Sequence, residues 1–139
     1  IGETNFFTGK VDRVENEYFL LDTERFGKIW FYKDMEVKEG QEIQISLRPE
    51  KVKITKDKPI VPEGVKLNVL KGVVDETIYL GSQTKYTVAI GQSFMKAFKQ
   101  HVRYLLDEVI ISWKDNVYVW WFADDSYVLR EMGGVPFEE

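Results

Sequence analysis

The chain has 139 residues, of which 44% are hydrophobic, with a formal net charge of −4 and no cysteine. This length suffices for one ordinary core or two small lobes packed together, while the charge argues against nucleic acid and anionic lipid as partners. The absence of cysteine excludes disulfides, thiolate metal sites and a cysteine nucleophile, and it fits a reducing cytosol. No apolar run approaches the roughly 20 residues of a membrane-spanning helix, and no signal segment opens the chain. We expect a soluble domain, and its start at Ile1 suggests a piece of a longer protein.

Alternating apolar and polar residues predict strands along most of the chain. The first five cover residues 10–14, 18–22, 28–32, 42–47 and 52–55. A polar crossing segment with two prolines, 59–67, follows them. The later strands cover residues 70–79, 84–90, 109–113, 117–121 and 127–130. These patterns predict an all-β fold.

The stretch 93–108 has two interpretations. Apolar residues at helical spacing behind Ser93, a suitable N-cap, favour an amphipathic helix. Residues 93–99 alternate equally well, and the internal repeat requires a strand here. We predict a strand over 93–99, followed by a turn or short helix.

The sequence repeats itself, because NFFTGKVD at residues 5–12 recurs as NVLKGVVD at residues 68–75. This repeat explains Gly9-Lys10, which looks like part of a phosphate-binding loop. Six residues separate Gly2 from Gly9 where such a loop has four, and Val11 offers no oxygen to Mg²⁺. The loop interpretation therefore fails.

A second echo closes each repeat. Ile43, Ile45, Leu47, Pro49-Glu50 and Ile54 align with Val117, Val119, Trp121, Ala123-Asp124 and Leu129. Two related β units that pack together bury apolar faces that neither could bury alone. We predict two OB-like small-barrel units with at most one short helix. The first unit covers 1–58 and the second 68–132, with the crossing segment 59–67 between them and a C-terminal tail, 133–139.

Side chains suited to catalysis are few. His101 is the only histidine and has no partner at metal-ligand or triad spacing, which favours a surface or packing role. Asp124 and Asp125 would point to opposite faces of a strand, and acidic residues at a strand exit commonly form turns. No serine–histidine–aspartate set, HExxH motif or glycine-rich phosphate loop is present in the sequence. We predict no catalytic, cofactor-binding or metal-binding residues in this segment, which by itself is not an enzyme.

The aromatic run Tyr118, Trp120, Trp121 and Phe122 has two interpretations. OB-folds stack nucleic-acid bases on such side chains. Strand alternation instead divides the run between two faces, as in a core or an interface, and we favour this interpretation. Lysines alternate with apolar residues at the end of the first unit, so we expect them on a solvated face or guarding a sheet edge. They are Lys51, Lys53, Lys56 and Lys58.

Four stretches resemble the transport-associated OB-like (TOBE) domain, the C-terminal regulatory region of ABC-importer ATPase subunits. They are IGETNFFTG at 1–9, EGQEIQISLRPEKVKI at 39–54, IYLGSQTKYTV at 78–88 and WWFADDSYVL at 120–129. In that family G-E-x-N-F, here with Glu3 and Asn5, follows directly after the nucleotide-binding domain. The phrase L-R-P-E, here with Arg48 and Glu50, closes the first β unit. The likeness spans nearly the whole chain.

Phe6-Phe7 and the stretch 78–86 look most similar to the spermidine/putrescine importer branch. Branches for iron, maltose-type sugars and other small solutes share parts of these motifs. The motif candidates in the stretch 78–86 are Gly81, Ser82, Lys85 and Tyr86. The extension 101–116, which makes the second unit eleven residues longer than the first, departs from the family's usual close.

The resemblance implies a cytoplasmic subunit peripheral to the inner face of the cell membrane. An N-terminal domain ahead of this segment would bind ATP and Mg²⁺ and hydrolyse ATP, so no cofactor is expected in the segment itself. Two copies would sit beneath a pair of transmembrane permease subunits. The C-terminal β domains of such ATPases contact each other across the dimer and, in some branches, bind regulators or the transported solute. The expected partners are thus its own ATPase domain, a second copy and the permease.

A polyamine is a further expected partner, because a negative surface attracts a polycation. Carboxylates beside an aromatic ring would hold its ammonium groups. The candidates are Asp124 and Asp125 with Trp121, or Glu76 with Tyr79. Two other functions stay open, a free-standing module for single-stranded nucleic acid and a small-oxyanion-binding protein. The net charge argues against the first.

Two motifs also have a direct physical interpretation. Gly81 lies where the alternation breaks, as expected for a turn or bulge with positive φ. Arg48 and Glu50 flank Pro49, so a contact from Arg48 to a carboxylate would lock one unit against the other or against the ATPase domain. Alternatively, Pro49 only ends a strand and Arg48 is solvated.

Overall fold

The computed structural model describes residues 4–101 and 109–132. Within them, ten strands form two five-stranded antiparallel sheets, and the predicted all-β, OB-like fold is confirmed. The strands are β1 (Asn5–Glu15), β2 (Tyr18–Thr23), β3 (Gly27–Tyr32), β4 (Glu42–Leu47), β5 (Lys53–Thr55), β6 (Leu67–Tyr79), β7 (Gln83–Ile90), β8 (Ser93–Gln100), β9 (Asn116–Phe122) and β10 (Tyr127–Met132). In this described part, no helix has the length and apolar character needed to cross a membrane.

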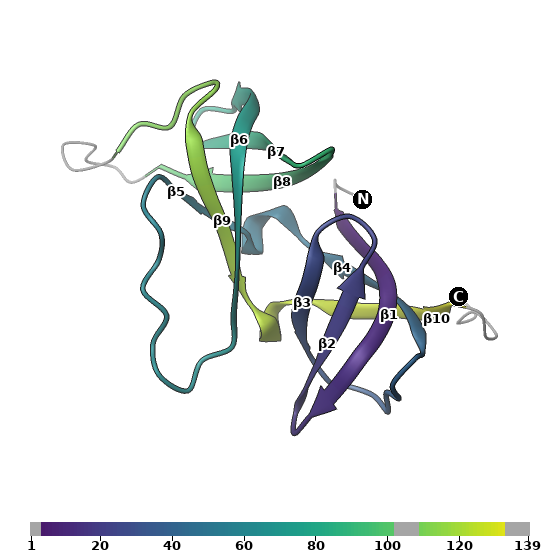
Figure 1. Cartoon of the computed structure of the whole chain (residues 1–139). Coiled ribbons are helices and arrows are strands. Elements are labelled where there is room, and N and C mark those ends of the chain that lie inside the picture. Colours follow the sequence, from purple (N-terminus) through teal and green to yellow (C-terminus); the bar gives the residue numbers. More distant parts are fainter. Residues whose placement is uncertain (1–3, 102–108, 133–139) are drawn as a thin grey trace.

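Each sheet takes one strand from the other half of the chain. The first sheet has the order β10-β4-β1-β2-β3, and the second has the order β5-β9-β6-β7-β8. Figure 1 shows the yellow strand β10 with the purple and blue strands of the first sheet, whereas β5 lies against β9. The two sheets therefore have equivalent strand orders, and the last strand of each repeat completes the sheet of the other. The repeat alone did not predict this exchange.

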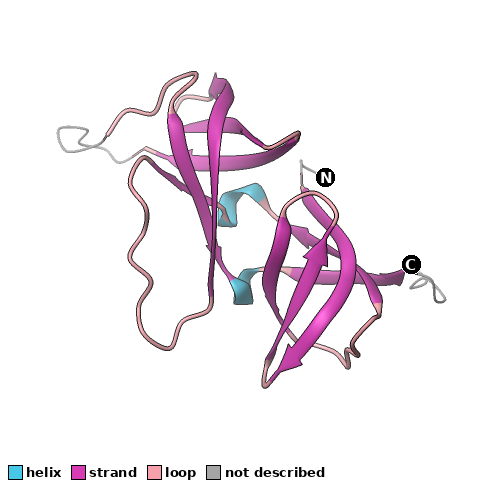
Figure 2. Cartoon of the chain, viewed as in Figure 1, coloured by secondary structure: helices cyan, strands magenta, loops and turns pink. Residues whose placement is uncertain are grey.

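Two short 3₁₀ helices lie where the chain passes from one sheet to the other (Figure 2). Helix η1 (Pro49–Lys51) follows β4, and η2 (Ala123–Asp125) follows β9. The predicted alignment of Pro49-Glu50 with Ala123-Asp124 is therefore confirmed. Pro49 suits the first position of η1, because its φ is already near the helical value and its missing N–H is not needed there.

The repeated phrase has the same structural role in both units. Val11 and Val74 are buried, and the pairing register shifts directly after each of them, as in a β-bulge. Glycine precedes each valine where the neighbouring strand comes close. A Cβ on Gly9 would lie 2.8 Å from the carbonyl carbon of Asp22, and one on Gly72 would lie 2.6 Å from a carbonyl oxygen on β7. No side chain fits at either place, so glycine recurs.

One core joins the two sheets. The ring of Phe7 in the first sheet lies 5.4 Å from that of Phe31 and 5.6 Å from that of Trp121 in the second sheet. Trp121 is 0% exposed. The favoured interpretation of the aromatic run is thus confirmed, because Trp121 faces the core and Trp120 on the opposite face is only half-buried.

Two predictions near residue 100 have different outcomes. The strand over 93–99 is confirmed as β8, while the helix alternative and the extension 101–116 fall partly on residues 102–108, outside the described residues. The strand predicted over 109–113 is wrong, because residues 109–112 have no regular structure and Trp113 begins a turn. Its alternation arises from Ile111, which is buried beside exposed neighbours without pairing to another strand. The boundaries 1–58 and 68–132 stay a prediction about the sequence repeats, and the tail 133–139 lies outside the described residues.

The same turn precedes β4 and β9. The N–H of Gly40 donates to the carbonyl of Val11 at 2.8 Å, and the N–H of Lys114 donates to that of Val74 at 2.8 Å. Both turn residues have positive φ, 84° at Gly40 and 68° at Lys114. A side chain is disfavoured in this region, so Lys114 carries backbone strain that Gly40 avoids.

We expect Lys114→Gly to be more stable than Lys114→Ala by about 1 kcal/mol. Both variants lose the ammonium that lies 4.4 Å from the centre of the Trp113 ring, so their difference isolates the backbone. Urea denaturation of the two variants measures it. The matched pair Lys10→Gly and Lys10→Ala, in β1, should give the opposite sign, because glycine weakens a strand interior. Equal stability of the two Lys114 variants would contradict the strain.

Candidate functional site

Two asparagines join the sheets at equivalent places. The Asn5 side chain accepts from the N–H of Lys96 at 2.8 Å and donates to its carbonyl at 2.9 Å. The Asn68 side chain makes the same two bonds to Trp30, both at 2.8 Å. Lys96 and Trp30 lie in β8 and β3, the edge strands of the two sheets. Each asparagine thus satisfies the exposed backbone of an edge strand and fixes one sheet against the other.

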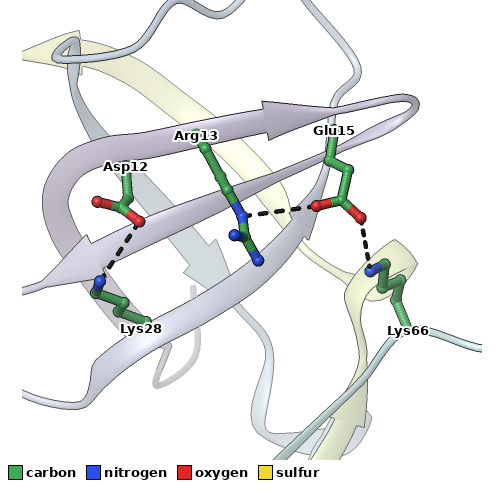
Figure 3. A network of polar contacts seen from close by, with 5 residues as sticks. All are labelled: Asp12, Arg13, Glu15, Lys28 and Lys66. Carbon is green, nitrogen blue, oxygen red and sulfur yellow. Dashed lines mark hydrogen bonds and ion pairs between the residues drawn. The ribbon is translucent and has the colours of Figure 1, made fainter.

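Charged side chains surround Trp30. The ammonium of Lys66 lies 4.0 Å from its ring centre, and the guanidinium of Arg13 lies 5.4 Å from it. Glu15 pairs with both cations at 3.6 Å (Figure 3). Figure 3 also shows the ion pair of Asp12 and Lys28, at 3.4 Å. Because these pairs are partly exposed, each contributes little stability. The pair of Glu15 and Lys66 connects β1 of the first sheet to the residue before β6 of the second.

The first hairpin of the second unit is longer than that of the first. Ten residues separate the paired Glu76 and Thr87, against six between Arg13 and Leu20. The turn of this longer hairpin contains Gly81 with φ of 81°, which confirms the predicted positive φ. The β6–β7 hairpin of the second sheet is therefore longer than the corresponding β1–β2 hairpin of the first.

A pocket of about 310 Å³ lies at this extended end of the second sheet. Thr77 and Tyr79 of β6, Thr84 and Tyr86 of β7, and Lys99 of β8 line one side. They share one face because they pair directly across the strands. Apolar residues of the segment before β9 also line the pocket, namely Val109, Ile110 and Ile111.

His101 completes the pocket. Its Nε2 lies 2.6 Å from the Thr84 hydroxyl, and its ring stacks on that of Tyr79 with centroids 5.6 Å apart. Its backbone N–H donates to the carbonyl of Ser82 at 2.9 Å. These contacts agree with the predicted surface or packing role of His101; the motif candidate Ser82 lies beside it, and Tyr86 lines the same pocket.

The remaining motif candidates do not gather at this pocket. The Arg48 Nε lies 3.4 Å from a carboxylate oxygen of Glu50, two residues along the chain and largely exposed. The contact is therefore local and does not lock the units together. Lys85 pairs with Ile78 and Phe98, one position along from the pocket-facing pairs and hence on the opposite face. Glu3 lies outside the described residues.

The acidic turn after β9 contacts the first sheet through Asp124. Asp124 accepts a hydrogen bond from the Tyr18 hydroxyl at 3.0 Å. Burial, followed by this hydrogen bond, raises the pKa of Tyr18. Because Trp121 is fully buried, its ring is unavailable to a cation held by Asp124 or Asp125.

The lysines that end the first unit are dispersed. Lys53 is exposed on β5, an edge strand, which agrees with the predicted role of guarding an edge. The ammonium of Lys56 lies 3.1 Å from Asp115. The Ser112 N–H, at 2.7 Å, and then Lys56 lower the pKa of the Asp115 carboxyl. This contact ties the chain directly after β5 to the turn before β9.

Several residues of the sheet junction and of the pocket were not predicted from the sequence. Asn68 was visible only as the repeat partner of Asn5, and the likeness of the two phrases was the signal that could have assigned both to one role. Lys99 and the apolar residues 109–111 carried no signal, because only the fold brings them to the same pocket.

The description "TOBE domain" belongs to the family model that matches residues 45–129. A Thermotoga maritima protein named spermidine/putrescine import ATP-binding protein PotA is 45% identical over 131 residues, which are 94% of this chain and 35% of that protein. The Protochlamydia amoebophila protein of the same name is 38% identical over 131 residues, again 94% of this chain and 35% of its own length. The chain thus spans about a third of the length of these relatives.

Among solved structures, the cytoplasmic molybdate-binding protein ModG with molybdate bound is similar, with a TM-score of 0.70. The match covers 95% of this chain and 96% of that one, at 15% sequence identity. At this identity the likeness concerns the fold alone, and it agrees with two OB-like units joined in one body.

Proposed function

The chain belongs to the TOBE-domain family, and on this premise we propose that it is the regulatory domain of the ATP-hydrolysing subunit of an ABC importer for polyamines. The observation that carries the proposal is the 45% identity, over 94% of this chain, to a protein named for spermidine and putrescine import. ATP and Mg²⁺ would bind in the ATPase domain that makes up the rest of such a subunit.

In this proposal the domain acts mechanically. It would contact its own ATPase domain and a second copy of the subunit, keeping two ATPase domains together beneath the permease subunits at the cytoplasmic face of the membrane. The shared core supports this role, and so do the side chains of Asn5 and Asn68, which we call the asparagine clamps. A spacer that transmits movement must be rigid, and these contacts fix one sheet against the other. The aromatic run supplies no stacking surface at Trp121, which favours this function over binding of single-stranded nucleic acid.

The test is transport by the complete subunit. The full gene product and its permease subunits, reconstituted in vesicles, should take up spermidine and putrescine with ATP, but neither maltose nor molybdate. Removal of the region that contains residues 5–132 should lower uptake and dimer formation while the remaining ATPase domain still binds ATP. A gene with no ATPase region, or uptake of maltose in place of polyamines, would overturn the proposal.

We extend the proposal to feedback by a cytoplasmic polyamine. Asp124 and Asp125, or Glu76 and Tyr79, would hold its ammonium groups, although Glu76 and Tyr79 lie on opposite faces of β6. Calorimetric titration of the chain with spermidine in moderate salt tests this step, with single-stranded DNA and molybdate as controls for the two other functions. Asp124→Asn and Asp125→Asn should weaken a true site there, whereas heats equal to buffer would remove feedback and leave the transport assignment standing.

A further inference from the structure

We propose that the pocket beside His101 binds a small molecule that combines an apolar body with a carboxylate, a ligand opposite in charge to a polyamine. The pocket lies where the second unit departs from the first. Its occupant can be tested on this chain alone, so the inference does not depend on the proposed transport function.

The pocket exists because the segment before β9 covers its end of the second sheet incompletely. We call this segment, and the segment before β4 in the first unit, the caps of the two sheets. In the first unit Val37 is buried and Met35 packs against the core, which closes the corresponding end of the sheet. The shared turn at Gly40 and Lys114 aligns Val37 with Ile111, and Met35 with Val109. Ile111 is buried like its counterpart, but Val109 is 59% exposed. The second cap therefore leaves open what the first covers.

Exposed apolar side chains line the opening of the pocket. Tyr79 is 73% exposed and Ile110 is 77% exposed, and both line the same opening as Val109. Covering such side chains is favourable in proportion to the apolar area removed from water. The volume is at the small end of ligand pockets, which fits a metabolite with a compact ring or branched chain.

Charge selects the other end of the ligand. Lys99 follows the buried residues Met95 and Ala97 on the inner face of β8, so its side chain is half-buried at the pocket. Its ammonium makes no ion pair or hydrogen bond with any described residue, and no aspartate or glutamate is among those that line the pocket. A charge drawn partly out of water is disfavoured without a counter-charge. A carboxylate would supply it, whereas a polyamine would meet a like charge.

The polar groups around Lys99 can complete the recognition of a carboxylate. Thr84 is the cross-strand partner of Lys99, and its hydroxyl is already oriented by its hydrogen bond to His101. The stacked rings of His101 and Tyr79 provide a flat wall on the same side. An anionic head beside Lys99 and an apolar body against Tyr79 and Ile110 would therefore use both the polar and the apolar lining of the pocket.

The experiment uses three probes that differ only in their head group. They are 3-phenylpropanoate, its neutral amide 3-phenylpropanamide, and the cation 3-phenylpropylamine, each titrated into the chain while its backbone amide signals are followed by NMR. We expect the carboxylate to shift the signals of Thr84, Lys99 and Ile111 and to bind about tenfold more tightly than the amide. The amine should shift none of them.

Three variants assign the site. Lys99→Met should abolish the preference for carboxylate over amide, whereas the matched control Lys53→Met, an exposed strand lysine, should leave it unchanged. Thr77→Trp, which fills the pocket from an exposed position, should weaken both ligands. Unchanged NMR dispersion shows that each variant folds. Shifts scattered over the surface, binding of the amine at the same amides, or an unchanged preference in Lys99→Met would each overturn the proposal.

Discussion

Gly9→Ala is expected to lower the free energy of unfolding by about 3 kcal/mol. The new methyl group would lie 2.9 Å from the Cα of Thr23 and closer still to the backbone carbonyl of Asp22, and neither can move without shifting β2 away from β1. Gly72→Ala should cost about 2 kcal/mol, because part of its contact is with the side chain of Val88, which can rotate. Urea denaturation followed by tryptophan fluorescence measures both.

The control for these variants is Gly81→Ala. Nothing lies within 4 Å of a Cβ at Gly81, whose φ of 81° is nonetheless unfavourable for alanine. We expect a loss of about 1 kcal/mol there, from the backbone alone. Equal losses at Gly9 and Gly81 would mean that strand contact does not explain why glycine recurs in the repeat.

The second large effect is expected from Asn68→Ala. The variant leaves the N–H and carbonyl of Trp30 without the two hydrogen bonds they now make at 2.8 Å. A buried backbone group without a partner costs about 1–3 kcal/mol, so a loss of about 3 kcal/mol is expected for the pair. Asn5→Ala should show a similar loss, since Asn5 makes the same bonds to Lys96.

Asn116→Ala is the matched control, because this asparagine is exposed at the start of β9. Its effect should stay within about 0.5 kcal/mol. Hydrogen exchange adds a local measurement, in which the Trp30 amide should lose protection in Asn68→Ala but keep it in Asn5→Ala. A loss below about 1 kcal/mol in Asn68→Ala would show that the shared core holds the sheets without the clamps.

Most strands were predictable from sequence because each has one buried and one exposed face, which imposes alternation. The segment 93–99 illustrates this, since its strand follows from Met95 and Ala97 facing the core. The error at 109–113 has a related cause. Burial of Ile111 under the sheet produced a strand-like pattern in a segment that pairs with no strand. Alternation reports which side chains are buried, and it does not report hydrogen bonding.

The strand exchange and the pocket were not predictable in this way. A pattern within β5 or β10 carries no information about which sheet the strand joins, because the two sheets bury equivalent faces. The motif 78–88 did direct attention to the long hairpin, and Tyr86 indeed lines the pocket. The position of Lys99 at the pocket could not be predicted, because a lysine in an alternating strand is expected to be solvated unless the shape of the second sheet is known.

The exchange of fifth strands also has a consequence for the order of events during synthesis. When residues 1–58 leave the ribosome, they contain β1 to β4 but not β10, so the outer edge of β4 has no neighbour. That edge stays available for incorrect pairing until nearly the whole second repeat has been translated. Because its closing contacts join distant parts of the sequence, we expect folding to be slow and to reach completion only after translation of residue 132.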